Sequence, residues 1–183
     1  VFDGLPFRNI VSWTAIITGL VRAGFNSQGL MYFSNMWRDG FEYDSYMFVI
    51  ALKACADMEL LKYGKEIHAR TMKKGLAHSL AVANSLMTMY SKCGLYDLAS
   101  IIFHELTRRE IISGSSIIAG YAQGGAGEEA FELLSWMRRE GPKPTEFALS
   151  SVFGSMAILD QGRQLHAFKK LWYEVLSACS HIC

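Results

Sequence analysis

Apolar residues recur along the chain with the spacing of helices that bury one face. The first set follows the spacing i, i+3, i+4, i+7 and comprises Trp13, Ile16, Ile17 and Leu20. Such positions share one side of an α-helix. Gly24, Asn26 and Ser27 then interrupt the pattern before a second apolar face, which comprises Leu30, Phe33, Met36 and Trp37. Because Gly40 ends this second run, the pattern predicts two antiparallel helices of about a dozen residues each.

The same cycle repeats along the chain. A small residue in the middle of each expected second helix recurs in steps of 35, 35, 31 and 32 residues, at Gly29, Gly64, Ala99, Ala130 and Gly162. These recurring positions form a ladder along the sequence. A second ladder, four positions later, keeps the same steps and comprises Phe33, His68, Phe103, Leu134 and His166. Because one hairpin cannot bury its apolar face alone, consecutive hairpins must stack. The sequence therefore predicts an all-α fold, an α-solenoid of stacked antiparallel helix hairpins, with no β-sheet over residues 10–145.

The repeat also predicts where the helices end. Breaks are expected near residues 24, 40, 58, 75, 94, 108, 125 and 142, where glycine, proline or polar residues interrupt the apolar faces. The aromatic residues on these faces are expected in the core, and they are Trp13, Phe33, Trp37, Phe103 and Trp136.

Composition excludes several classes of protein. The net charge is only +1, with 51% hydrophobic and 19% charged residues, which argues against a disordered or strongly basic chain. The longest uninterrupted apolar run, residues 47–52, is far shorter than the roughly 18 residues of a membrane span. No membrane partner is therefore expected. The four cysteines lie far apart or at the extreme end, unlike those of a secreted disulfide scaffold.

The sequence gives little support for a catalytic or metal-binding motif. Cys179, His181 and Cys183 are residue types that bind zinc, but they have no second ligand pair. Cys179 also aligns with Cys55, which is expected to pack as a small apolar residue. The sequence has no zinc-deaminase signature, no Walker-type phosphate loop and no Gly-x-Ser-x-Gly motif. We therefore expect no metal, no cofactor and no enzymatic activity of its own.

Three segments carry a family resemblance. Residues 8–20 (RNIVSWTAIITGL) resemble an ordinary repeat, residues 51–56 (ALKACA) with 63–69 (YGKEIHA) a long repeat, and residues 82–94 (VANSLMTMYSKCG) a short repeat. Together they are similar to plant pentatricopeptide repeat proteins, of the subclass with alternating ordinary, long and short repeats. The resemblance covers nearly the whole chain.

The resemblance implies a division of the chain into units. These are the tail of a preceding short repeat (1–9), an ordinary repeat (10–44), a long repeat (45–79), a short repeat (80–110), an ordinary repeat (111–145), a shortened long repeat (146–170) and an incomplete repeat fragment (171–183). We expect a partial member of the family, with unusually exposed apolar residues at its ends, including Phe2, Leu171, Trp172 and Val175. In the second ordinary unit Gly114 replaces the tryptophan of the first, Trp13, which is expected to weaken packing.

The resemblance also implies binding of single-stranded RNA, about one base per repeat. In this family the fifth and last residues of a repeat read the base, and we call them its reading pair. The implied pairs are Thr14 with Asp44, Asn84 with Glu110, and Ser115 with Thr145, while the aliphatic Val11 and Ile112 would flank the base. Thr14 with Asp44 matches the family's purine-reading combination, with guanine favoured, whereas Glu110 and Thr145 depart from its pattern. Val49 and Ser79, in the long unit, are not expected to be reliable readers.

The function that the resemblance implies is RNA binding in organellar transcript processing or C-to-U RNA editing, in a mitochondrion or plastid, with a separate editing or processing enzyme as partner. Two other functions stay open beside it. A targeting peptide is expected outside this sequence. The alternatives are a protein-interaction scaffold, as in tetratricopeptide arrays, and an inactive truncated fragment. The basic cluster Lys62, Lys65, Arg70, Lys73 and Lys74 fits either phosphate contacts or a solvated outer face.

Overall fold

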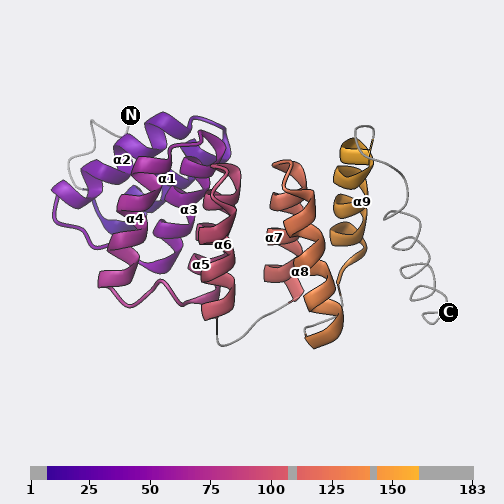
Figure 1. Ribbon diagram of the computed structural model, residues 1–183. Coiled ribbons are helices and arrows are strands. Elements are labelled where there is room, and N and C mark those ends of the chain that lie inside the picture. Colours follow the sequence, from indigo (N-terminus) through magenta and orange to yellow (C-terminus); the bar gives the residue numbers. More distant parts are fainter. Residues whose placement is uncertain (1–7, 107–110, 141–143, 161–183) are drawn as a thin grey trace.

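The computed structural model describes residues 8–106, 111–140 and 144–160, and in these ranges the regular structure is entirely α-helical (Figure 1). The helices are α1 (Ile10–Arg22), α2 (Asn26–Arg38), α3 (Ser45–Asp57), α4 (Leu61–Lys73), α5 (Leu80–Lys92), α6 (Tyr96–Glu105), α7 (Ile111–Gln123), α8 (Gly127–Glu140) and α9 (Glu146–Asp160). The all-α prediction is therefore confirmed over the described part of the chain. The breaks expected near residues 24, 40, 58, 75, 94 and 125 each fall between two consecutive helices, and those near 108 and 142 lie outside the described residues.

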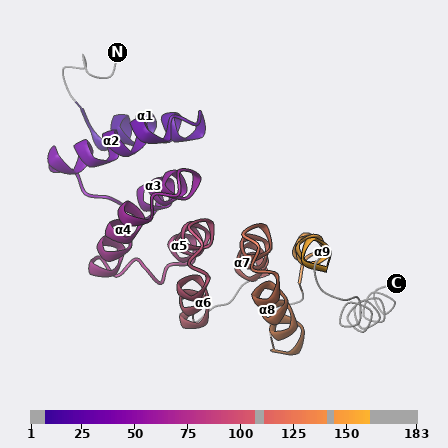
Figure 2. The same ribbon diagram turned by 45° about the horizontal axis from the view of Figure 1, so that its top comes forward.

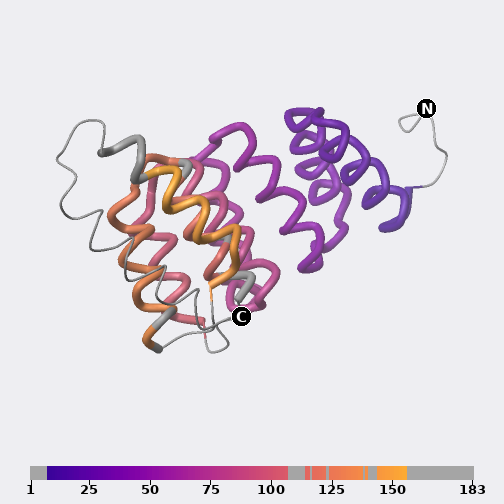
Figure 3. The backbone as a smooth tube through the Cα atoms, turned by 90° about the vertical axis from the view of Figure 1, so that its right-hand side faces the viewer, coloured from indigo at the N-terminus to yellow at the C-terminus, as the bar shows by residue number. Residues whose placement is uncertain are grey.

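The helices form successive hairpins that follow an arc (Figure 2). The first helices of the hairpins, α1, α3, α5, α7 and α9, stack on one another along the concave side. The second helices, α2, α4, α6 and α8, lie on the outer side, and each also packs against the first helix of the next hairpin. Figure 3 shows the same succession from the side, with the α1–α2 hairpin at one end and α9 at the other. This is the predicted α-solenoid.

Local sequence signals set the helix ends. Asn9 caps α1, because its side chain accepts a hydrogen bond of 2.9 Å from the Ser12 amide while the Ser12 hydroxyl accepts one of 3.0 Å from the Asn9 amide. At the other end, Gly24 has a φ of 84°, a conformation that glycine adopts without steric cost. The chain therefore reverses after α1 with its last carbonyl groups still hydrogen-bonded, since the Phe25 amide donates to the Leu20 carbonyl at 2.9 Å.

Aromatic residues hold the first two hairpins together. The rings of Phe33 and Tyr43 stack with centroids 4.0 Å apart, and Phe48 meets Tyr43 edge-on at 5.4 Å. All three side chains are buried, as is Trp13. The core prediction is wrong for Trp37, which is 48% exposed, with the Arg70 guanidinium 5.9 Å from its ring centroid. Its ring stacks on Tyr43, with centroids 5.3 Å apart, so Trp37 packs at the edge of the core and not inside it.

Gly114, where weaker packing is expected, lies against a buried methionine. A Cβ atom added to Gly114 would lie 2.6 Å from the Met137 sulfur, so the side chain of Met137 fills the space beside this glycine. Met137 is itself fully buried. Because methionine is flexible, it adapts to gaps that a rigid ring would otherwise fill.

Some expectations fall on other parts of the chain. Phe2, His166, Leu171, Trp172, Val175, Cys179 and Cys183 lie outside the described residues. Cys55 is fully buried, as expected of a small apolar residue. Among the described helices, none is both long and apolar enough to cross a membrane.

Candidate nucleic-acid interface

A groove of about 560 Å³ follows the exposed side of α1 and reaches the start of α3. Its lining residues are Ile10, Val11, Thr14, Ala15, Thr18, Gly19, Arg22, Asp44 and Tyr46. Both helices are first helices of their hairpins, and these helices lie on the concave side of the solenoid (Figure 2). We therefore assign the groove to that side. It combines apolar walls, small polar groups and one cation, which are the elements that single-stranded nucleic acid requires.

The structure places the first reading pair in this groove. Thr14 lies in the middle of α1 and Asp44 directly before α3, and both line the same cavity. Asp44 caps α3, with one carboxylate oxygen accepting a hydrogen bond of 2.8 Å from the Met47 amide. The capping bond uses one oxygen and fixes the carboxylate at the groove. A hydroxyl and a carboxylate therefore face a common space.

The lining of the groove also includes two exposed apolar side chains, one on each of its two helices. Val11, on α1, is 71% exposed, and Tyr46, on α3, is 40% exposed. Tyr46 stands 35 residues after Val11, so it occupies the equivalent position of the next unit. Sequence reasoning missed Tyr46, although the ladder of 35-residue steps could have found it. An aromatic ring and an aliphatic side chain in one groove can both contact the faces of a planar base.

Arg22 supplies the cation of the groove and was also missed. It is the last residue of α1, and its side chain is exposed. A guanidinium in this place can bind a phosphate group of a bound strand. Its signal in the sequence was a basic residue in the last helical turn.

The structure also brings the reading pair of the second ordinary unit together. The Thr145 hydroxyl donates a hydrogen bond of 3.0 Å to the Ser115 hydroxyl oxygen. Thr145 caps α9 as well, because its hydroxyl oxygen lies 3.2 Å from the Ala148 amide nitrogen. Ser115 is only 6% exposed. These two hydroxyls therefore bond to one another instead of facing an open groove.

The third reading pair is described only in part. Asn84 lies half-buried on α5, and its side-chain oxygen is buried with no hydrogen-bond partner among the described residues. An unsatisfied buried acceptor is costly, so a donor from a ligand would be favourable there. Glu110, its expected partner, and the side chain of Ile112 lie outside the described residues. The pairing of Asn84 with Glu110 thus stays a prediction.

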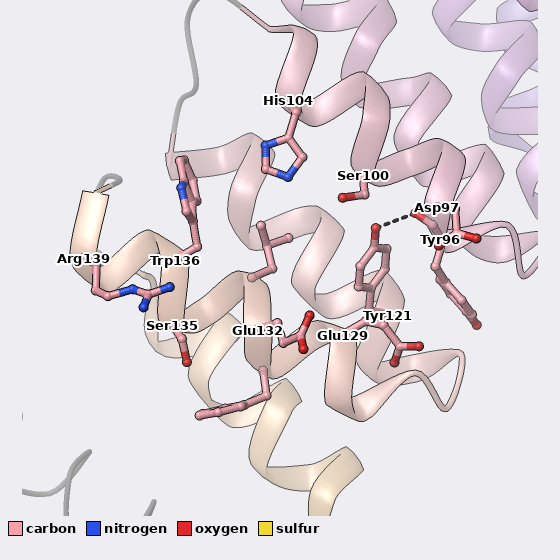
Figure 4. Close-up of a pocket in the computed structure, with 12 residues that line it drawn as sticks. Tyr96, Asp97, Ser100, His104, Tyr121, Glu129, Glu132, Ser135, Trp136 and Arg139 are labelled. Carbon is pink, nitrogen blue, oxygen red and sulfur yellow. Dashed lines mark hydrogen bonds between the residues drawn. The ribbon is translucent and has the colours of Figure 1, made fainter.

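A second cavity lies on the outer side, between α6 and α8, with a volume of about 520 Å³ (Figure 4). Its lining carries three carboxylates, Asp97, Glu129 and Glu132. On its floor the Tyr121 hydroxyl donates a hydrogen bond of 2.6 Å to the Tyr96 carbonyl, and burial raises the pKa of Tyr121 to about 12. Carboxylates repel phosphate, so this cavity does not suit a nucleic-acid backbone.

The basic cluster on and after α4 does not indicate a second nucleic-acid site. Of the basic cluster on and after α4, Lys74 pairs with Glu42 at 3.0 Å and Arg70 covers Trp37. Because α4 is an outer helix, this arrangement favours the interpretation as a solvated outer face. The described residues contain no group of three or more His, Cys, Asp or Glu side chains that could hold a metal ion.

These features define a class of protein, an α-solenoid of helix hairpins with small polar groups in a concave groove. The sequence matches the family model of the PPR repeat at residues 11–41, 82–111 and 115–142, and that of the pentatricopeptide repeat domain at residues 30–93. The chain belongs to the pentatricopeptide repeat family.

Several curated relatives are pentatricopeptide repeat-containing proteins of Arabidopsis thaliana. One is 34% identical over 91% of this chain and 38% of its own length. A chloroplastic relative is 36% identical and a mitochondrial one also 36%, each over 91% of this chain but only 20% and 27% of their lengths. The chain therefore spans well under half of each of these relatives.

Solved structures with the same fold include the pentatricopeptide repeat protein PPR10 from maize. Its crystal structure matches with a TM-score of 0.68 at 20% identity, covering 85% of this chain and 24% of PPR10. PPR10 in complex with an 18-nt psaJ RNA element matches with a TM-score of 0.72 at 19% identity, covering 91% and 26%. At such low identity these likenesses establish the shared solenoid fold.

Proposed function

We propose that this chain is a sequence-selective module for binding single-stranded RNA. The observation that carries the proposal is the concave groove whose lining includes Thr14, Asp44, Val11 and Tyr46. Membership of the pentatricopeptide repeat family and the likeness to an RNA-bound solenoid support it.

The groove suits guanine best. Guanine presents adjacent N–H donors on its Watson–Crick edge, and the Asp44 carboxylate is an acceptor. The Thr14 hydroxyl both donates and accepts, so it can pair with a second atom of the same edge. Val11 and Tyr46 would enclose the faces of the base, and Arg22 would bind a phosphate group. Each of these five residues then has one role in holding a nucleotide.

In the cell, we propose that the module directs organellar transcript processing or C-to-U RNA editing. It would supply the address, while a separate enzyme supplies the chemistry. Relatives named as chloroplastic and mitochondrial support residence in one of these organelles. The fold by itself also suits a scaffold that binds peptides, and the experiment below separates the two functions.

The test is to titrate the 183-residue chain with short single-stranded RNA pools, by fluorescence anisotropy at two salt concentrations. We expect binding that weakens with salt, because cationic contacts release counterions. Thr14→Asn should shift the base preferred at this register from guanine towards uracil. By analogy with other base contacts, discrimination of about 1–3 kcal/mol corresponds to roughly tenfold to hundredfold in affinity.

Two further variants make the test specific. Thr18→Asn introduces the same side chain one turn away in the same groove and should leave base preference unchanged. Asp44→Asn keeps the helix cap but replaces the acceptor, so it should weaken guanine binding without unfolding α3. Absence of RNA binding, or binding with no base preference in the native chain and the Thr14 variant, would contradict the proposed function.

A further inference from the structure

The groove cation Arg22 has equivalents in the next two units. Asp57 follows it by 35 residues and Lys92 by 70, and the three are the last residues of α1, α3 and α5. The concave side thus carries a cation, an anion and a cation at the equivalent position of three successive units. An acidic residue at the end of a helix is unfavourable, because the helix dipole is negative there. Helix preference therefore does not explain Asp57.

Asp57 is held between two lysines. Its two carboxylate oxygens contact different ammonium groups, Lys53 at 2.5 Å and Lys92 at 2.8 Å. Lys53 lies on α3 and Lys92 on the neighbouring first helix α5, so this Lys53–Asp57–Lys92 cluster bridges two repeats. Lys53 is also the 35-residue equivalent of Thr18, which lines the groove of the first unit. The cluster thus continues the register of the groove-lining residues along the concave side.

Stability gives little reason for this cluster. The side chains of Lys53 and Lys92 are about half exposed, and ion pairs of this kind contribute at most about 1 kcal/mol each. Burial would raise the pKa of the Asp57 carboxyl, but hydrogen bonds from Lys53 and Lys92 outweigh it and hold that pKa below its ordinary value. The carboxylate is therefore ionised at neutral pH. The two lysines and the single carboxylate leave one net positive charge.

The geometry of the cluster resembles an occupied anion site. A carboxylate with one oxygen on each ammonium group presents the same charge, and a similar pair of oxygens, as an RNA phosphodiester. We propose that Lys53 and Lys92 form a binding site for one backbone phosphodiester, and that Asp57 occupies it as an internal competitor that RNA must displace. The ligand named here rests on the proposed RNA-binding function. Such competition weakens backbone binding at the long unit and leaves more of the selection to base contacts.

The test compares the full chain with its Asp57→Asn variant, using two probes. One is a short guanine-containing RNA, and the other is an abasic ribose-phosphate oligomer that offers phosphates without bases. Loss of the competitor should raise the affinity for both probes by about threefold to tenfold. It should also steepen the salt dependence by about 0.7 in logarithmic slope, the value for one added phosphate contact on a single strand.

Three variants control for other effects. Asp39→Asn removes an equivalent charge from an exposed ion pair with Arg8 at the end of the outer helix α2, and should give a smaller gain. Lys92→Gln in the Asp57→Asn background should cancel the gain, whereas Lys92→Gln alone should have less effect. Asp57→Ser provides a second removal of the charge if asparagine disturbs the helix end.

Each result supports or overturns the proposal that Asp57 competes with a phosphate group. Equal gains from the Asp57 and Asp39 variants, a gain that survives Lys92→Gln, or no binding of the abasic oligomer would overturn it. Stronger binding of the abasic oligomer together with an unchanged base preference in Thr14→Asn would support the phosphate site and contradict base reading. Unchanged binding of the abasic oligomer, together with a changed base preference in Thr14→Asn, would contradict the phosphate site alone.

Discussion

The hydroxyl of Thr145 donates a hydrogen bond to the hydroxyl oxygen of Ser115 over 3.0 Å, joining the end of one repeat unit to the first helix of that unit. Thr145 also caps α9. In the first ordinary unit the equivalent residues, Thr14 and Asp44, line an open groove instead. To read a base, the Ser115–Thr145 pair would have to exchange its own hydrogen bond for one with the base. We therefore expect the first ordinary unit to discriminate bases more strongly than the second.

This relationship gives a stability prediction. Thr145→Ala removes both the hydrogen bond to Ser115 and the cap of α9, and should lower the free energy of unfolding by about 1 kcal/mol. Thr145→Ser keeps the hydroxyl and should cost much less. Urea denaturation followed by circular dichroism measures both. Equal losses in the two variants would show that the threonine methyl group, not the hydroxyl, is responsible.

Two glycines within helices form a matched pair for testing how closely α1 and α2 pack in the first hairpin. A Cβ atom at Gly29 would lie 2.5 Å from a methyl group of Val21, whereas one at Gly19 would meet nothing within 4 Å. Alanine is favoured over glycine in helices by about 1 kcal/mol, so Gly19→Ala should stabilise the chain. Gly29→Ala should destabilise it by about 1–2 kcal/mol, because the stiff valine cannot move aside easily. Thermal melts of both variants test this contrast, and a stabilising Gly29→Ala would refute the tight contact.

A third prediction concerns the stack between the first two hairpins. The Tyr43 hydroxyl donates a hydrogen bond of 2.7 Å to the Phe33 carbonyl in a buried setting. Tyr43→Phe keeps the ring but loses this bond, and should lower the free energy of unfolding by about 1 kcal/mol. Tyr46→Phe makes the same change at an exposed ring and should have a smaller effect. If the two variants lost equal stability in chemical denaturation, the buried bond would not be the cause.

Much of the fold could be predicted from the sequence because its determinants are local and repeated. A helix stop such as Gly24 acts within one turn, and the ladder from Gly29 to Gly64 shows that the same hairpin recurs. The environment of a side chain at the edge of a helix is different, since it depends on the next hairpin. Trp37 was expected in the core, yet it is about half exposed, with Arg70 of α4 over its ring.

The candidate site, like the fold, could be predicted from the sequence only in part. The family resemblance placed Thr14 and Asp44 at positions 30 residues apart, and stacking of the first helices brings both to one groove. Tyr46 and Arg22 had weaker signals in the sequence, and only the stacking of α1 and α3 shows that both line the same groove. The hydrogen bond between Ser115 and Thr145 likewise depends on side-chain positions across 30 residues of chain.

The fourth prediction concerns the dependence of stability on pH. The Nδ1 atom of His68, on α4, lies 2.9 Å from the Tyr90 hydroxyl of α5. Burial lowers the pKa of His68 below its ordinary 6.5; Glu105 acts in the opposite direction and His78 adds to the lowering. The unfolded chain therefore binds a proton at His68 more readily than the folded chain. Its contribution to stability is present above about pH 6.5 and is lost as the pH falls below that value.

We expect the denaturation midpoint of the native chain to fall between pH 7.5 and pH 5.5, and the fall to be smaller in His68→Gln, which has no group to titrate there. The lowered pKa of Asp57 acts only in more acidic solution, since its ordinary value is 3.8, so it does not contribute in this window. His78→Gln removes an exposed imidazole but leaves His68 in place, and should retain most of the fall. Urea denaturation at several pH values measures all three proteins. An unchanged pH dependence in His68→Gln would show that burial of this imidazole does not disfavour its charged form.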